Sequence, residues 1–164
     1  MKLLKLVGVL LDYPRDELWE SRAELQAAVA DPAVPEKYRA ALQAFLDSLL
    51  GGDPLEQQSE WIETFDRGRS MSLLLFEHIH GESRDRGQAM VDLNRAYEDK
   101  GFKLAARELP DYLPLVLEFL SHQDKPLVQD WLVNISHLLA LLATRAKARG
   151  SRYQPLFNLL VELS

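Results

Sequence analysis

The sequence predicts an all-α fold, a single-domain helical bundle of about eight or nine helices. Apolar residues recur at spacings of three and four along almost the whole chain of 164 residues, which is the pattern of helices packed on one face. Glycine, proline and aspartate separate these stretches at positions typical of helix ends. No stretch has the pattern of a β-hairpin, a repeat or a linker, so we expect residues 1–164 to form one domain.

The composition excludes several classes of protein. Hydrophobic residues make up 47% of the chain, which excludes wholesale disorder, and cysteine is absent, which excludes disulfides and thiolate chemistry. The N-terminal apolar run is interrupted by Asp12, and no stretch reaches the roughly 20 apolar residues of a membrane span. The net charge of −6 argues against a nucleic-acid partner and favours a basic one. We expect a soluble cytoplasmic protein without stable membrane insertion.

The helices of the N-terminal third are separated by clear breaks. The first covers residues 3–10 and ends at the sequence DYPRD. The second runs from about 16 to 30, and the third runs from 35 to 50. Gly51 and Gly52 follow the third helix, and they predict a left-handed C-terminus.

The next helix has the clearest start in the chain. Asp53 is the expected N-cap, Pro54 occupies the first helical position and Glu56 completes an Asp-x-x-Glu capping box. The residues expected on its inner face are Leu55, Ile62 and Phe65.

The C-terminal half also has helical periodicity. We expect helices over 73–84, over about 90–100, from Asp111 to about 120, and over 127–149, and the chain ends on the apolar segment LFNLLVELS. In the segment ELPDYLPLVLEFL, Asp111 is the expected N-cap, which would place Pro114 in the first turn, where no intrahelical donor is lost. One oxygen of Asp111 would bind the N–H of Leu113, and the other would remain available.

The segment LLLFEHIHGESRDRG combines the residue types of several kinds of site. His78, His80 and Glu82 could share a metal ion on a strand, whose side chains alternate, but they diverge on a helix. Ser83 and Asp85 add the elements of an acid–base site, but neighbouring polar residues do not form a triad. The glycines lack the spacing of a phosphate loop.

An ion-pair network between helices is the interpretation that the segment favours. Its basic residues are arginines, which suit partly buried, bidentate pairing with carboxylates. The residues expected in this structural network are Asp66, Arg67, Arg69, Glu82, Arg84, Asp85 and Arg86.

The segments FDRGRSMSLLLFEHIHGESRDRGQAMVDL, ELPDYLPLVLEFL and SRYQPLFNLL closely resemble the TorD/DmsD/NarJ family of redox-enzyme maturation chaperones, in particular its nitrate reductase branch. The resemblance implies an all-helical TorD/DmsD-like fold, no catalysis and no cofactor of its own. It implies binding of the N-terminal leader-like peptide of the nitrate reductase catalytic (alpha) subunit, and assistance to molybdenum cofactor insertion before membrane attachment. Molybdenum cofactor biosynthesis proteins are further candidate partners. It also implies a chain that is shorter at its C-terminus than is usual in the family.

The resemblance also indicates where a peptide would bind. The family's Pro-Asp-His motif corresponds to Pro110, Asp111 and Tyr112, and Tyr112 departs from the histidine. An amphipathic helix in an apolar groove is the expected binding mode, where the segment 65–80 meets the helix from Asp111. The residues expected to bind the peptide are Phe65, Leu73, Phe76, Glu77, His80, Pro110, Asp111, Tyr112 and Leu117.

This placement of the peptide-binding groove can be tested by substitution. Charge reversal at Asp111, together with Leu-to-Glu changes at Leu73 or Leu117, is expected to weaken peptide binding without unfolding the domain. Two alternatives remain open: a small nucleotide-binding protein or enzyme using Arg84, Arg86 and His80, and an adaptor without a groove.

Overall fold

A computed structural model describes residues 1–80 and 83–164 of the chain. The described part is helical, and its β-type pairing is confined to an isolated bridge between Leu74 and Tyr112. The helices are α1 (Lys2–Leu11), α2 (Glu17–Glu20), α3 (Arg22–Ala30), α4 (Glu36–Leu50), α5 (Pro54–Trp61), a π-helical segment (Ile62–Asp66), α6 (Leu75–Ile79), α7 (Asp85–Asp99), α8 (Leu113–Ser121), α9 (Lys125–Ala148) and α10 (Gln154–Leu163). The predicted all-α bundle is confirmed.

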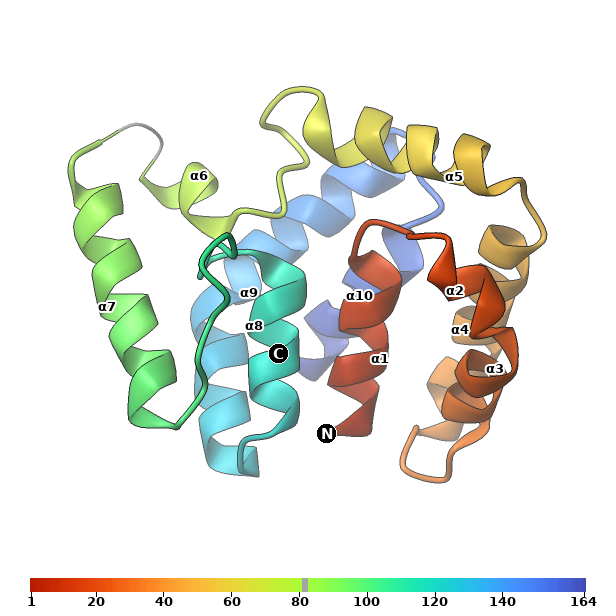
Figure 1. Ribbon diagram of the computed structural model, residues 1–164, viewed down its shortest axis with the longest axis horizontal. Coiled ribbons are helices and arrows are strands. Elements are labelled where there is room, and N and C mark those ends of the chain that lie inside the picture. The colour runs from red at the N-terminus through yellow and green to blue at the C-terminus, as the bar shows by residue number, and fades with distance from the viewer. Residues whose placement is uncertain (81–82) are drawn as a thin grey trace.

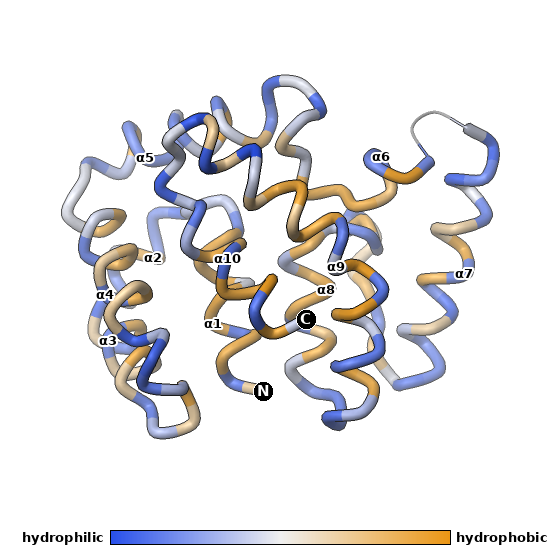
Figure 2. The backbone as a smooth tube through the Cα atoms, turned by 180° about the vertical axis from the view of Figure 1, so that it is seen from behind, coloured by the Kyte–Doolittle hydropathy of each residue, from blue (hydrophilic) through white to orange (hydrophobic). Residues whose placement is uncertain are grey.

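Two helices far apart in the sequence form the centre of the bundle. Figure 1 shows α1 and α8 side by side, with α9 and α10 behind them and α2 to α4 on one side. The helix α5 crosses one end, and α7 stands at the opposite edge from α2 to α4. Figure 2 shows that α1, α8 and α10 are the most apolar helices, as their central position requires.

A glycine allows α1 and α8 to approach closely. A Cβ added at Gly8 would lie 3.2 Å from the carbonyl oxygen of Pro114 and 3.3 Å from the Cβ of Leu117. The N-terminal amine donates to the carbonyl of Ser121 over 2.6 Å at the far end of the same contact. The two helices therefore run antiparallel, and each buries leucines against the other.

The predicted helix over 16–30 is two helices, α2 and α3, separated at Ser21. Side chains on both sides of this break reach the end of α4. Trp19 Nε1 donates to the carbonyl of Gly52 over 3.2 Å, and Arg22 donates to the carbonyl of Leu50 over 2.7 Å. These donors satisfy carbonyls that the end of α4 leaves without helical partners.

The predicted left-handed terminus after α4 is wrong. Gly51 has a φ of −76°, and neither Gly51 nor Gly52 has a positive φ. Instead Gly52 is tightly packed, since a Cβ there would overlap the side-chain amide of Gln57. Positive φ values do occur at Gly101 and Gly150, which follow α7 and α9.

The start of α5 agrees with the prediction, but its inner face does not. Asp53 accepts from the N–H of Glu56 over 3.3 Å as the N-cap. Leu55 is 74% exposed, whereas Phe65 is buried as expected. The buried face of the segment consists of Gln57, Trp61, Thr64 and Phe65. The sequence pattern did not show the π-helical segment, which changes the register of the side chains at the end of α5.

The helix predicted over 73–84 is mostly absent in the described residues. Only Leu75–Ile79 form α6, and Leu73 and Leu74 lie in non-helical backbone beside the start of α8. Residues 81 and 82 of the predicted helix lie outside the described residues. The predicted long helix over 127–149 is confirmed as α9.

The helix α9 departs from the expectation that no stretch of the chain is long and apolar enough to span a membrane. By length and composition alone, α9 is apolar enough to cross a membrane. In this fold its apolar side packs against α10 and buries Val128, Leu132, Leu138, Leu139 and Leu142.

Candidate functional site

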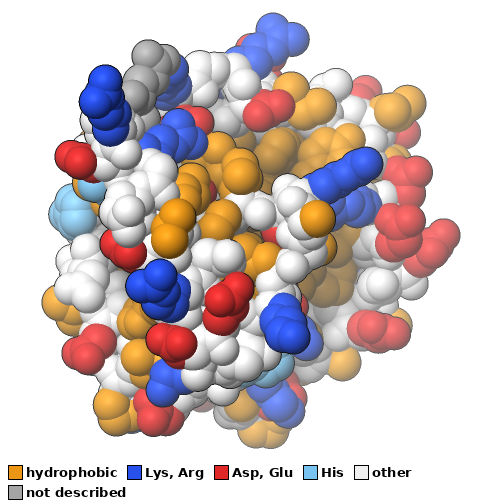
Figure 3. All heavy atoms as spheres, turned by 60° about the vertical axis from the view of Figure 1, so that its left-hand side comes forward, with side chains coloured by type: hydrophobic (Ala, Val, Ile, Leu, Met, Phe, Trp, Pro, Cys, Tyr) orange, Lys and Arg blue, Asp and Glu red, His pale blue; other side chains and the backbone are white. Residues whose placement is uncertain are grey.

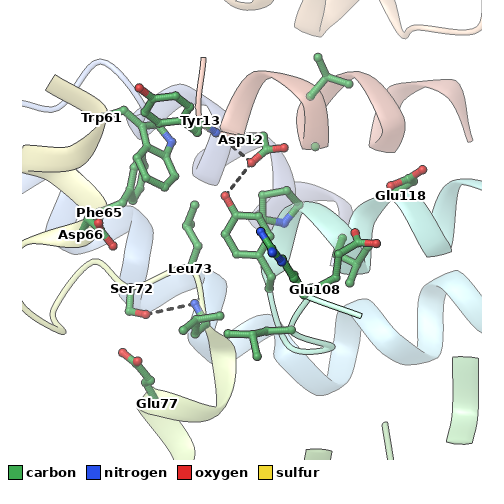
Figure 4. A pocket seen from close by; sticks show the side chains of 18 of the residues that line it. Asp12, Tyr13, Trp61, Phe65, Asp66, Ser72, Leu73, Glu77, Glu108 and Glu118 are labelled. Carbon is green, nitrogen blue, oxygen red and sulfur yellow. Dashed lines mark hydrogen bonds between the residues drawn. The ribbon is translucent and has the colours of Figure 1, made fainter. Parts of the chain in front are cut away.

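The described part of the molecule has an open cleft of about 780 Å³. It lies between α1, the end of α5 with the π-helical segment, the segment 68–77, the segment 107–109 and α8. Figure 4 shows the side chains of these elements converging on the cleft, and Figure 3 shows a hollow with hydrophobic side chains bordered by charged ones. A cleft of this size and lining is typical of a binding site.

Aromatic rings form one wall of the cleft. Tyr13 packs edge-on against Trp61 with ring centroids 5.4 Å apart, and Trp61 contacts Phe65 at 5.3 Å. The indole Nε1 of Trp61 donates to the carbonyl of Leu11 over 2.9 Å, so its polar atom is already satisfied. The wall therefore offers apolar ring surface to a ligand.

Tyr112 connects the cleft to the end of α1. Its hydroxyl donates to Oδ1 of Asp12 over 2.7 Å, and the N–H of Tyr13 donates to the same oxygen over 2.9 Å. Burial, followed by the nearby Asp12 carboxylate, raises the pKa of Tyr112 far above its usual range. The phenol therefore remains a neutral donor and fixes α1 to the start of α8.

Asp111 is not the N-cap of α8, so the capping prediction is wrong. The N-cap is Tyr112, and the N–H of Leu113 donates to the carbonyl of Leu73 over 2.8 Å. Because this backbone carbonyl satisfies Leu113, the Asp111 carboxylate is directed to another helix. Its Oδ2 accepts from the N–H of Phe76, in the first turn of α6, over 3.0 Å.

The environment of Asp111 is unfavourable for a charge. The residue is fully buried, and its Oδ1 has no hydrogen-bond partner among the described residues. Burial raises the pKa of its carboxyl, against the opposing effect of the Phe76 N–H and the Arg86 charge. The spare oxygen expected from the sequence exists, but it lies inside the protein and not on a surface.

The structure brings part of the predicted peptide-binding set together. Phe65, Leu73, Glu77 and Tyr112 all line the cleft. The remaining residues of the set lie outside its lining: Phe76, His80, Pro110, Asp111 and Leu117.

Each residue outside the lining has an identifiable contact. Phe76 and His80 pack against each other with ring centroids 5.4 Å apart. The carbonyl of Pro110 accepts from the hydroxyl of Tyr97 over 2.6 Å. Leu117 is fully buried where α8 meets Gly8.

The predicted arginine network is largely a set of exposed side chains. Arg67 pairs with Glu63 over 3.2 Å on the surface, and Arg86 of α7 pairs with Glu77 of α6 over 3.7 Å. The other described members of the predicted network are exposed: Asp66, Arg69, Arg84 and Asp85. Glu82 lies outside the described residues. Among the described members, Arg86 is the one that is partly buried, in its pair with Glu77, so the network as a whole stays a prediction.

Arginines at the end of α9 support the cleft wall instead. Arg145 donates to the carbonyl of Ser70 over 2.7 Å, and Arg149 reaches the carbonyls of Thr64 and Glu63 at 3.4 and 3.3 Å. Cations at the C-terminal end of a helix also complement its dipole. The spacing of four residues between these arginines places them on one face of α9, which is the signal that could have indicated a shared contact.

The metal interpretation does not match the geometry around His78. This residue lies on α6, not on a strand, and its Nε2 bonds the carbonyl of Ser72 over 2.8 Å. Across residues 1–80 and 83–164, no group of three or more histidine, aspartate or glutamate side chains is arranged to hold a metal ion.

Charges of both signs surround the cleft. Its lining includes carboxylates of Asp12, Asp66, Glu77, Glu108 and Glu118, and it includes basic side chains of Lys5, Arg15, Arg69 and Arg107. Opposed charges around an apolar wall favour a ligand with a particular arrangement of charges over one that is uniformly basic.

Several lining residues were not predicted as site residues. Val9 of α1 and Leu109 line the cleft, and both are partly exposed despite being apolar. Tyr13 and Trp61 were missed because aromatic residues in a helical bundle are most often core residues. The sequence signal that was available is Val9, an apolar residue on the outer side of a core helix.

Comparisons with known proteins agree with the resemblance in the sequence. The family model described as nitrate reductase delta subunit matches residues 31–158. The nitrate reductase molybdenum cofactor assembly chaperone NarJ of Escherichia coli (strain K12) is 49% identical over 162 residues, which is 98% of this chain and 69% of that protein. The probable assembly chaperone NarW of the same strain is 46% identical over 164 residues, which is 100% of this chain and 68% of that protein. The probable NarJ of Bacillus subtilis (strain 168) is 30% identical over 159 residues, covering 94% of this chain and 84% of that protein.

Proposed function

Because the chain belongs to the nitrate reductase delta subunit family, we propose that it is an assembly chaperone that binds the N-terminal leader-like peptide of the nitrate reductase catalytic subunit. The relatives named above are assembly chaperones and not catalysts, and the chain is not an enzyme. Binding would keep the catalytic subunit from the membrane until its molybdenum cofactor has been inserted. We place this activity in the cytoplasm, where the peptide and molybdenum cofactor biosynthesis proteins would both be reached.

The observation that carries the proposal is the cleft itself. It joins an aromatic wall, the exposed apolar side chains of Val9 and Leu109, and a charged border. An amphipathic helix presents an apolar stripe with polar residues on each side, and such a helix suits this combination. In the proposed site, Phe65, Leu73, Glu77 and Tyr112 line the cleft, while Asp111 holds α6 against the start of α8.

The nucleotide-binding alternative receives no support from the arrangement of its residues. His80 packs on Phe76, and Arg86 pairs with Glu77. Both side chains are therefore engaged with α6 rather than gathered around a cavity.

The test requires variants that remain folded. Leu73, Leu117 and Asp111 are buried, so charges introduced there are expected to disrupt the core, and these variants do not suit a binding test. Val9 is a better choice, because it lines the cleft and is 38% exposed.

The first prediction concerns Val9→Glu. A synthetic peptide of the catalytic subunit's N-terminal segment should bind the native protein in calorimetry, and Val9→Glu should lower the affinity by about tenfold or more, because the new carboxylate would lie against the apolar stripe. The matched control is Val133→Glu on α9, which is 53% exposed and outside the cleft lining, and which should bind normally. Equal affinity of the two variants would remove the cleft as the binding site, and no binding by the native protein would remove the proposal.

A further inference from the structure

A carboxylate at the end of α1 borders the cleft in a fixed orientation. Asp12 is the C-cap residue of α1 and lines the cleft. Its Oδ1 accepts from the hydroxyl of Tyr112 over 2.7 Å and from the N–H of Tyr13 over 2.9 Å. Figure 4 shows both hydrogen bonds, with the carboxylate next to the aromatic wall of Tyr13 and Trp61. Two donors, a buried phenol and a backbone N–H, therefore hold this side chain in one orientation.

The other oxygen of Asp12 has room for a further donor. A carboxylate offers about four lone-pair sites, and Oδ1 already uses two of them. Oδ2 faces the guanidinium of Arg15 at 3.5 Å, and the side chains of Asp12 and Arg15 are 34% and 66% exposed. An ion pair of this length and exposure is weak. Oδ2 can therefore accept a second cation without losing a strong partner.

The other carboxylates of the cleft lining are held differently. Glu77 already pairs with a guanidinium of α7 over 3.7 Å. Asp66, Glu108 and Glu118 are exposed, and Glu108 accepts one backbone N–H over 2.8 Å. An exposed acidic side chain loses rotamer freedom when it pairs with a ligand, which offsets much of the attraction. Asp12 is already ordered, so a ligand that pairs with it meets a smaller entropic cost.

The surroundings of Asp12 favour a positive charge. The helix α1 ends at Leu11, and the C-terminal end of a helix carries roughly half of an elementary negative charge. The ring of Tyr13 also lines the cleft, and aromatic rings attract ammonium and guanidinium groups. A cation at this position would therefore meet a full carboxylate charge, the negative end of a helix and an aromatic side chain together.

From these contacts we propose that Asp12 anchors one cationic group of the bound peptide, and that Tyr112 positions the Asp12 carboxylate for this contact. The inference rests on the proposed function and deepens it, because it names the residue of the cleft that recognises the charge of the peptide. The group bound is an ammonium or a guanidinium, whose N–H donors form charge-assisted hydrogen bonds with Oδ2. The peptide can supply it from a basic side chain or from its N-terminal amine.

The first arm of the test measures, by calorimetry, the affinity of a synthetic peptide of the catalytic subunit's N-terminal segment. Asp12→Asn keeps an acceptor oxygen for Tyr112 and Tyr13 but removes the charge, so it should lower the affinity by about tenfold. The matched control is Asp31→Asn, which removes the same charge outside the cleft lining. The Asp31 carboxylate likewise accepts a backbone N–H, that of Ala33 over 2.8 Å, and pairs with a lysine over 3.0 Å.

The outcomes of this arm separate the anchor from the proposed function. The control should bind as tightly as the native protein. If folded Asp12→Asn binds as tightly as the control, the inference is overturned and the proposed function stands. If the native protein binds no peptide, the proposed function is overturned and the anchor with it.

The second arm changes the peptide to identify the source of the cation. One peptide has an acetylated N-terminus, another has its lysines and arginines replaced by glutamine, and a third has both changes. The difference in affinity between the native protein and Asp12→Asn should disappear for the third peptide, because it has no cation to pair with the carboxylate. The single change that already removes the difference identifies the group that Asp12 binds. A tenfold difference that persists with the third peptide contradicts the inference.

The third arm tests the positioning role of Tyr112. Tyr112→Phe removes a donor to Asp12, so it should lower the affinity several-fold in the native protein and cause no further loss in Asp12→Asn. A purely structural role of the phenol would lower the affinity equally in both backgrounds, and that result would overturn the positioning role.

The last arm distinguishes the carboxylate from its pair with Arg15. Arg15→Gln removes a cation that competes for Oδ2, so the affinity should equal or exceed that of the native protein. If Arg15→Gln instead weakens binding as much as Asp12→Asn does, the intact pair is what the peptide requires, and Asp12 is not the anchor.

Discussion

The Asp111 residue joins two segments through its backbone and its side chain together. Its carbonyl accepts from the N–H of Leu75 over 3.0 Å, and its Oδ2 accepts from the N–H of Phe76 over 3.0 Å. These N–H groups belong to the first turn of α6. A helix this short offers them no other partner of its own. At the residue scale, Asp111 therefore acts as a cap for α6 from a distant part of the chain.

A pair of substitutions separates the hydrogen bond from the charge. Asp111→Ala removes the acceptor of the Phe76 N–H and should lower the free energy of unfolding by about 1–3 kcal/mol. Asp111→Asn keeps an acceptor oxygen of the same shape and should retain most of the stability at neutral pH. Urea unfolding of both variants checks this, and equal losses in the two would show that the charge matters more than the acceptor.

The same variants have an expected pH dependence. Burial raises the pKa of the Asp111 carboxyl in the folded protein above its ordinary value of 3.8. Below 3.8 the carboxyl is protonated in both states, and as pH rises the unfolded state ionises first, which favours unfolding. The stability of the native protein relative to Asp111→Asn should therefore fall as pH rises from below 3.8 toward neutrality. A relative stability that rises over this range would contradict the burial effect.

At the scale of elements, side chains from one helix repeatedly satisfy the exposed carbonyls of another. Trp19 and Arg22 bind carbonyls at the end of α4, and Arg145 and Arg149 bind carbonyls of the π-helical segment and the loop after it. Such contacts replace the local caps that sequence patterns describe. They also determine the position of the cleft wall next to Phe65.

A substitution in α9 tests this support. Arg145→Gln removes the donor to the carbonyl of Ser70 and should lower the free energy of unfolding by about 1 kcal/mol, with faster amide hydrogen exchange in residues 66–72. Lys147→Gln, an exposed position on the same turns of α9, is the matched control. Equal exchange in the two variants would show that the loop does not depend on α9.

The elements that the sequence predicted well are those whose ends are set by local chemistry. The Asp53 cap, the long apolar stripe of α9 and the glycines after α7 and α9 act within a few residues. The errors concern contacts between distant segments. The Leu73 carbonyl takes the N–H that would have bound Asp111, and the contact of Arg145 with the carbonyl of Ser70 was not predicted. Four of the predicted peptide-binding residues line the cleft, while Val9 and Trp61, which also line it, could not be separated from the core by pattern alone.

At the scale of the whole molecule, the charge affects association more than it affects the fold. The chain has a net charge of −6, while the cleft is bordered by charges of both signs. A basic peptide is therefore attracted over long range by the molecule as a whole, and its final position depends on individual pairs.

The long-range attraction by the net charge and the individual pairs at the cleft should respond differently to salt. The association rate of the catalytic-subunit peptide should fall several-fold as the Debye length shrinks from about 10 Å at 0.1 M to about 3 Å at 1 M, while the dissociation rate changes little. Stopped-flow measurements over this range provide the check. The control is a peptide whose lysines and arginines are replaced by glutamine, and its binding should show little salt dependence. A dissociation rate that changes as much as the association rate would contradict the prediction.

The antiparallel contact of α1 with α8 has a consequence for biosynthesis. The residues of α1 are made before those of α8, and the helix that covers their leucines follows about 110 residues later, which takes on the order of 10 s at ordinary translation rates. During that interval a strongly apolar helix has no native partner, so the nascent chain is exposed to aggregation until α8 emerges. A protein that we propose shields a segment of another polypeptide would thus, while it is being made, need shielding for one of its own helices.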